Sequence, residues 1–323
     1  MMKRISVHEM ISGVPIGKSA VLQFPTILFV LVAIISMAVT GQAFAREKVI
    51  EKTFSGIESI KMKVVLSRCE VVRSSDGLVH MTFSHDYDPD EIDVDFRERN
   101  GRLTIEEDLD CDNCGRGRSL WVLELPDGIK FRFKGATGGV DIRSLDIDFS
   151  ADTGTGSYLI EDCGGSFDLN TGTGDIELKN STGEFEFNTG TGKIEIFGCS
   201  GEYDTNTGTG RVRIEDSKFD GPGEFNSGTG RVTVILTYGT EYDIDASCGT
   251  GNATVDLDGN EPFGYFEFEA QERRGRISSP FEFDGEEEFE RNDTWYVRKY
   301  FQRGSDDVII RIITGTGRAS LKK

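Results

Sequence analysis

The 323-residue chain has few of the residues on which most active sites and nucleic-acid interfaces depend. It contains three histidines, of which only His80 and His85 lie beyond residue 45, and it contains neither a G-x-S-x-G nor an H-x-x-E motif. This scarcity argues against nucleophilic triads and the common zinc sites, and we expect two surface histidines and no cofactor. Lys and Arg number 36 against 56 Asp and Glu, a net charge of −20. Nucleic-acid binders need the opposite balance, so no nucleic-acid partner is expected.

A signal peptide for export is predicted at residues 1–45. Three basic residues precede a mainly apolar run of thirteen residues, 27–39, and Ala43-x-Ala45 forms a small-residue cleavage pattern. An uncleaved anchor beginning near Val21 is the alternative, but such a run is short for a membrane span. We therefore expect a product that is exported to the periplasm, the cell surface or the extracellular space, with no stable membrane span after cleavage.

An eighteen-residue repeat dominates the middle of the chain. Copies and close variants of Thr-Gly-Thr-Gly begin at residues 135, 153, 171, 189, 207, 227, 248 and 314. Each repeat has two halves, in which a Gly-containing turn precedes alternating polar and apolar residues. This alternation is typical of a strand with one buried face. Two short strands cannot bury their apolar faces alone, whereas stacked repeats can.

The predicted fold class is all-β: a two-sheet β-solenoid, or β-roll, with 18-residue rungs, capped by β segments at both ends. Aligned repeats place four columns of side chains inside, which begin at Val140, Ile142, Phe149 and Ala151. A polar ladder of Asp152, Asn170, Asn188, Asn206 and Asn226 is expected at a structural corner. After the signal peptide we expect an N-terminal β cap at 46–134, the β-solenoid at 135–257, and a C-terminal excursion with a closing rung at 258–323.

Two features of roughly residues 50–323 are typical of a known family of proteins. One is the recurrent rung Thr-Gly-Thr-Gly-x-apolar-x-apolar, and the other is Leu-Pro-Asp-Gly at 125–128, before the first rung. The chain resembles the bacterial putative-adhesin family of β-strand-repeat proteins, a domain of unknown function. The resemblance implies a β-repeat fold and an adhesin role, and it brings no catalytic residues. The chain departs from the family pattern in Cys111-x-x-Cys114 and in the long excursion at 258–306.

A column of acidic residues is predicted on the outward face of one sheet. Its members are Asp168, Glu186, Asp204, Glu224 and Asp245. Rungs stack about 4.8 Å apart, and carboxylates at that distance repel by about 1 kcal/mol in water. The column is the candidate binding face, for cations or a basic partner; a face that only keeps the exported chain soluble is the alternative. No metal site is predicted, because the calcium-binding nonapeptide repeat needs Asp where this chain has Tyr158 and Ile176.

The outward face of the other sheet carries both signs of charge. We expect ion pairs between successive rungs there, with Asp175 bound to Lys193 and Glu195 bound to Arg213.

Six cysteines in a chain that is expected to be exported suggest disulfides. We expect a local disulfide between Cys111 and Cys114, because one CxxC offers too few ligands for structural zinc. Cys163 and Cys199 share a register two rungs apart, a separation of roughly 9.6 Å. That separation exceeds the reach of a disulfide, so we expect these two residues to be unpaired with each other.

The expected function is that of a non-enzymatic, exported scaffold of the adhesin type, which binds at a cell surface or outside the cell. A glycan, a matrix protein or a cell-surface protein is the expected class of partner. The alternative is a carbohydrate-active β-helix enzyme acting on a polysaccharide, which would need one deep groove whose acids break the repeat pattern. Flat, repetitive faces favour the scaffold.

Overall fold

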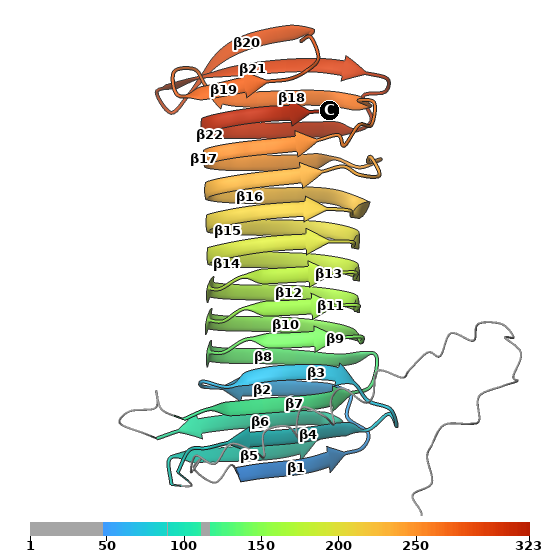
Figure 1. The fold of residues 1–323 in the computed structure, drawn as a ribbon, viewed down its shortest axis with the longest axis vertical. Helices are drawn as coiled ribbons and strands as arrows, with labels where there is room; N and C mark the ends of the chain where they lie inside the picture. Colours follow the sequence, from blue (N-terminus) through green and yellow to red (C-terminus); the bar gives the residue numbers. More distant parts are fainter. Residues whose placement is uncertain (1–47, 89, 111–116) are drawn as a thin grey trace, which may run out of the picture. The chain divides into compact units, whose positions relative to one another are not determined.

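The computed structural model describes residues 48–88, 90–110 and 117–323, and these residues form twenty-two strands and no α-helix. The strands belong to one hydrogen-bonded system of stacked rungs (Figure 1). The predicted all-β solenoid fold is therefore confirmed. The predicted signal peptide lies outside the described residues. Within those residues no helix is long and apolar enough to cross a membrane.

The central rungs follow one another in chain order. Their strands are β10 (Asp146–Thr155), β11 (Tyr158–Glu161), β12 (Gly164–Thr173), β13 (Ile176–Lys179), β14 (Thr182–Phe197), β15 (Ser200–Glu215), β16 (Lys218–Ile235) and β17 (Ile244–Asp256). Neighbouring rungs are parallel, and the paired residues of β12 and β14 lie eighteen positions apart in the sequence. The predicted inward columns are confirmed: Phe167, Phe185 and Tyr203 are in register, and each is at most 2% exposed.

From β14 onward the Thr-Gly-Thr-Gly segments are bends within continuous strands, so the prediction of turns between strands was wrong there. At the copies that begin at residues 153 and 171 the strands do end within the motif, at Thr155 and Thr173. β14, β15 and β16 each run through their copy of the motif. At these corners the backbones of successive rungs approach closely: a Cβ on Gly172 would lie 2.6 Å from the carbonyl oxygen of Gly154. A Cβ on Gly192 would overlap the carbonyl oxygen of Gly174. Both glycines of the motif are therefore required by the stacking of the rungs.

In five copies of the motif the first residue, Thr or Ser, fastens its rung to the preceding one. Thr171 Oγ1 donates to the carbonyl oxygen of Gly156 at 2.9 Å, and Thr189 Oγ1 donates to that of Gly174 at 2.9 Å. Ser227 makes the same contact with Gly210 at 3.3 Å. These buried hydroxyls satisfy corner carbonyls that would otherwise lack a partner.

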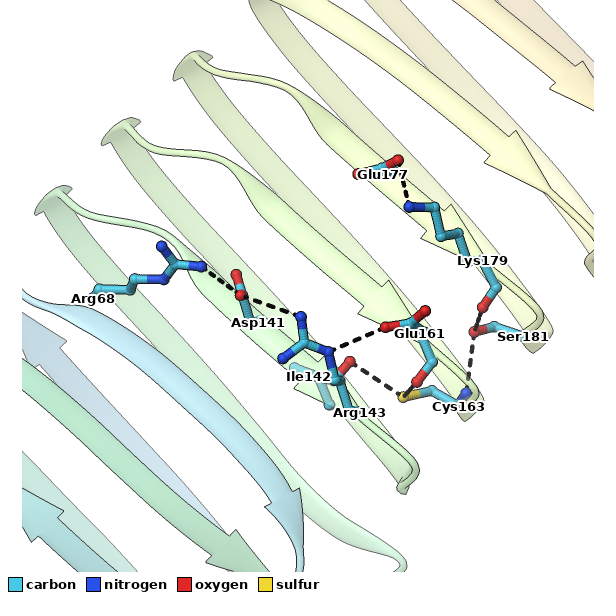
Figure 2. Close-up of polar contacts among 9 residues, drawn as sticks. All are labelled: Arg68, Asp141, Ile142, Arg143, Glu161, Cys163, Glu177, Lys179 and Ser181. Atoms are coloured by element: carbon cyan, nitrogen blue, oxygen red, sulfur yellow. Dashed lines mark hydrogen bonds and ion pairs between the residues drawn. The ribbon is translucent and has the colours of Figure 1, made fainter. Parts of the chain in front are cut away.

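The opposite corner contains a buried column of small polar side chains and thiols (Figure 2). The backbone N–H of Cys163 donates to Ser181 Oγ at 3.1 Å, and Ser181 Oγ donates to the carbonyl oxygen of Lys179 at 2.7 Å. Cys163 and Cys199 are free thiols with Ser181 between them. Burial raises the pKa of Cys199 to about 11, so this thiol stays protonated near neutral pH.

At the N-terminal end the order of the rungs differs from the order of the chain. The strands are β1 (Lys48–Phe54), β2 (Ser59–Val64), β3 (Arg68–Arg73), β4 (Val79–His85), β5 (Ile92–Arg99), β6 (Arg102–Leu109), β7 (Ser119–Leu125), β8 (Ile129–Thr137) and β9 (Val140–Arg143). The β2–β3 rung lies between the β6–β7 rung and the β8–β9 rung. β1, β4 and β5 cap this end. All their pairings are antiparallel: β1 pairs with β4, β4 with β7, and β5 with β6.

The corner of the β2–β3 rung, residues 65–67, contains no glycine and is bonded by buried Glu107 from β6 of the neighbouring rung. The Glu107 side chain is 3% exposed and accepts hydrogen bonds from the backbone N–H of Val65 at 3.1 Å, from Ser67 Oγ, and from Trp121 Nε1 at 3.0 Å. Several donors thus compensate for the removal of one carboxylate from water.

The expectation of two surface histidines was wrong for His85. Its side chain is 6% exposed and stacks on the ring of Phe83, with a centroid distance of 5.3 Å. Burial lowers the pKa of His85. His80 is partly exposed and lies 2.9 Å from Asp76.

At the C-terminal end the predicted closing rung is not the last rung. The strands are β18 (Gly264–Gln271), β19 (Gly275–Ser278), β20 (Gly285–Arg291), β21 (Thr294–Arg303) and β22 (Ile309–Lys322). β22, which carries the last Thr-Gly-Thr-Gly, pairs with β17 on one side and with β18 and β19 on the other. The β18–β19 rung lacks the glycine motif, so the repeat could not reveal it, yet Phe266 and Phe268 continue the core. The β20–β21 hairpin pairs with β18.

Replacing Gly190 by Ala should destabilise the protein by about 1–3 kcal/mol, because a Cβ would lie 2.6 Å from the carbonyl oxygen of Gly172. Replacing the adjacent, exposed Thr191 by Ala should change the free energy of unfolding by less than about 0.5 kcal/mol. Urea unfolding of both variants measures the difference. Equal effects would contradict the corner constraint.

Candidate functional site

The five predicted acidic residues lie in one column on the outward face of β12, β14, β15, β16 and β17. Asp168 pairs in register with Glu186, and Glu186 pairs with Asp204. The column continues through Glu224 to Asp245. The alternation of side chains along each strand places these acids outside, because the flanking residues Phe185 and Phe187 are buried. We call these five residues the acidic column.

Four members of the acidic column, Asp168, Glu186, Asp204 and Glu224, are exposed to solvent. Across residues 48–88, 90–110 and 117–323, no Lys or Arg forms an ion pair with any of these four. Asp168 Oδ1 accepts a hydrogen bond from Asn170 Nδ2 at 2.8 Å, a contact that adds no positive charge. The repulsion between successive carboxylates is thus left to solvent and counterions.

Basic residues bound the acidic column at both ends. Beyond Asp168 the same register position holds Ser150 and then Arg132. Beyond Asp245 it holds Arg311. The negative charge is therefore concentrated in five consecutive rungs.

Asp245 differs from the rest of the acidic column because it is partly buried. Its Oδ1 is buried and has no hydrogen-bond partner among the described residues. Burial raises the pKa of Asp245; nearby Arg311 opposes this shift, and Glu224 adds to it. The ionised form of Asp245 thus costs free energy in the folded protein.

Two further columns share this sheet face. Asp148, Ser166, Glu184 and Glu202 run along one side of the acidic column. The polar ladder runs along the other side and borders a groove of about 730 Å³, which the corner glycines also line. In the described part of the chain no group of three or more His, Cys, Asp or Glu could hold a metal ion.

The outward face of the other sheet carries several ion pairs (Figure 2). Arg68 lies 2.5 Å from Asp141, and Asp141 lies 3.8 Å from Arg143. Arg143 continues the chain to Glu161 at 3.1 Å. Figure 2 shows these residues side by side across successive rungs. This pairing contrasts with the unpaired acids of the acidic column.

The ion pairs that were predicted on this face are wrong in detail. Glu195 pairs with Arg211 at 2.5 Å, and Arg213 pairs with Glu215 at 2.7 Å. Asp175 accepts a hydrogen bond from the backbone N–H of Lys193 at 2.8 Å. Long arginine side chains reach diagonal and same-strand carboxylates as readily as those directly opposite, so register alone does not select the partner.

Cys111 and Cys114 lie outside the described residues, and their disulfide stays a prediction. A second hollow, near the loop at 237–243, was missed. Its signal in the sequence is the change of the repeat interval from eighteen to twenty and twenty-one residues around Ser227 and Cys248.

Replacing Asp245 by Asn should stabilise the protein at pH 7. The folded-state pKa of Asp245 is raised, so the folded protein holds this proton more tightly than the unfolded chain. Stability of the native sequence therefore falls as pH rises through that pKa. The advantage of Asp245→Asn should shrink as pH falls and vanish below the unfolded pKa of about 3.9.

Urea unfolding between pH 3 and pH 8 measures this difference. Glu186→Gln, at an exposed position in the same column, is the control for removing one negative charge. A stabilisation by Asp245→Asn that is independent of pH would contradict the assignment.

Solved structures with low similarity to this chain include several bacterial proteins. A protein described as a putative adhesin from Bacteroides fragilis is 15% identical, with a TM-score of 0.39, and the match covers 85% of this chain and 97% of that one. A putative adhesin from Parabacteroides distasonis is 11% identical, with a TM-score of 0.30 and coverage of 86% and 98%. A putative cell adhesion protein from Clostridium sporogenes is 13% identical, with a TM-score of 0.26 and coverage of 86% and 99%.

No curated protein matches the sequence. A family match covers residues 72–279, which is more than half of the 323-residue chain. That family is Toastrack DUF4097, a β-repeat domain of unknown function, so the predicted resemblance is confirmed. The chain belongs to the Toastrack DUF4097 family.

Proposed function

We propose that this protein is an exported, non-enzymatic β-solenoid scaffold of the adhesin type, and that the acidic column is its contact surface. The observation that carries the proposal is the difference between the two sheet faces. One face carries ion pairs between its acidic and basic residues, as between Arg143 and Glu161 at 3.1 Å. The other presents Asp168, Glu186, Asp204 and Glu224 exposed and in register.

The partner that fits this face is the basic surface of a matrix or cell-surface protein. Carboxylates that repel one another in the free protein gain free energy when a partner places ammonium or guanidinium groups between them. The arginines at both ends of the column, Arg132 and Arg311, would limit the register of such a partner. Export is supported by the leader pattern at residues 1–45.

The repetition of the carboxylates supports binding over glycoside hydrolysis. A glycosidase needs two carboxyl groups whose different surroundings give them different roles. Successive members such as Glu186 and Asp204 occupy equivalent places in equivalent rungs. A ladder of equivalent groups suits an extended contact.

A decalysine peptide tests the proposal, because it carries the positive charge without a fold of its own. The double variant Glu186→Gln, Asp204→Asn should weaken its binding by about tenfold at roughly 0.15 M salt. The control Glu98→Gln, Asp306→Asn removes the same charge from exposed positions outside the column. It should weaken binding by less than about twofold.

Titration calorimetry of both double variants measures the two affinities. Equal losses would show that net charge alone attracts the peptide, and the acidic column would then have no claim to be a binding face.

A further inference from the structure

A hollow of about 630 Å³ lies beside the last rungs of the stack and is lined by three exposed aromatic side chains. Tyr238 is 58% exposed, Tyr242 is 38% exposed and Phe263 is 54% exposed. They are half of the six large hydrophobic side chains that the described residues leave exposed; the others are Val49, Phe197 and Trp295. Their concentration around one hollow points to a ligand that contacts aromatic faces.

The hollow forms where the repeat becomes irregular. The register between β15 and β16 shifts at Gly201 and Tyr203, which accommodates two extra residues in β16. The loop after Leu236 then adds further residues before β17. The rungs therefore lose their equivalence in β16 and in the loop that follows it, and a single site can form there.

The segments around the hollow are held by internal hydrogen bonds. Asn260 Nδ2 donates to the carbonyl oxygens of Leu236 at 2.7 Å and Leu257 at 2.8 Å, which ties the two loops together. The backbone N–H of Tyr242 donates to Thr240 Oγ1 at 3.0 Å. Loops fixed in this way lose little conformational freedom when a ligand binds.

Charged groups stand among the aromatic rings. Lys218 Nζ lies 5.2 Å from the centre of the Tyr238 ring. Asp220, Glu241 and Glu261 also line the hollow; Asp220 accepts from Ser200 Oγ at 2.7 Å, and Glu261 pairs with Lys323 at 2.7 Å. A carboxylate has two acceptor oxygens, so each of these groups can accept further hydrogen bonds. Three carboxylates against Lys218 disfavour an anionic ligand.

The charges already present distinguish the remaining ligand classes. Lys218 lies over the Tyr238 ring and Lys323 pairs with Glu261, so a cationic ligand would meet positive charge there. Exposed aromatic rings beside carboxylates that accept hydrogen bonds from hydroxyl groups suit a neutral ligand with partly apolar rings and many hydroxyl groups.

We propose that this hollow binds a neutral oligosaccharide, whose pyranose faces pack on Tyr238, Tyr242 and Phe263 and whose hydroxyl groups donate to Glu241 and its neighbours. This site is distinct from the acidic column. It adds a glycan to the contacts of the protein, and it does not depend on a basic partner.

Calorimetric titration of the purified protein with neutral hexasaccharides tests the site. The probes are cellohexaose, maltohexaose, laminarihexaose, xylohexaose and hexa-N-acetylchitohexaose, each up to about 10 mM, so that a dissociation constant in the millimolar range is measurable. At least one should bind. Tyr238→Ala and Phe263→Ala should each weaken that binding by about tenfold or more.

Phe197→Ala is the matched control, because Phe197 is 47% exposed and lies outside the hollow. It should leave binding unchanged. Glu241→Gln keeps the shape of the side chain and should also weaken binding, and an unchanged thermal midpoint will show that the variants fold. Absence of binding by all five sugars would overturn the proposal, as would binding that survives both aromatic substitutions. Binding of trimethyl-lysine lost in Tyr238→Ala, without sugar binding, would assign the hollow to an organic cation instead.

Discussion

The close approach of the backbone at the Thr-Gly-Thr-Gly corners is the constraint on which the stack depends. Glycine is needed there because the carbonyl oxygen of the preceding rung occupies the space that a Cβ would fill, as Gly154 does for Gly172. The Thr171 hydroxyl then bonds the preceding rung at 2.9 Å. These corner contacts fix the register, and the register fixes every column, buried or exposed. The acidic column is a consequence of the same alignment that stacks Phe167 on Phe185.

The fixed register gives the two sheet faces different electrostatics. Where signs alternate, neighbouring rungs neutralise each other, as Glu195 and Arg211 do at 2.5 Å. Where one sign recurs, each rung adds to the negative potential of the preceding rung. At Asp245 partial burial also raises the pKa of the carboxyl group. A repeat can therefore build an extended charged surface with very little sequence information. It cannot build a single pocket without interruption, and the irregular rungs near Tyr238 supply that interruption.

The regular part of the fold was predictable because two periods coincide. Alternation at period two separates Ile176 from Asp175, and the eighteen-residue repeat places Ile176 beside Ile194. The ends were not predictable in the same way. β22 lies between β17 and β18, so chain order does not predict the order of the rungs. The corner of the β2–β3 rung has no glycine and is bonded by Glu107 of the neighbouring β6, so the glycine motif does not predict that rung. Pairing of long charged side chains such as Arg213 escaped prediction because several carboxylates lie within reach.

The distance between spin labels at the two ends of the acidic column tests the shared register most directly. Labels on Asp168→Cys and Asp245→Cys, with Cys111 and Cys114 replaced by Ser, are separated by four rungs, or about 19 Å before the label linkers are added. Pulsed electron paramagnetic resonance should give one narrow distribution near that value. A broad distribution, or one centred beyond about 35 Å, would contradict a stack in which these acids share one column.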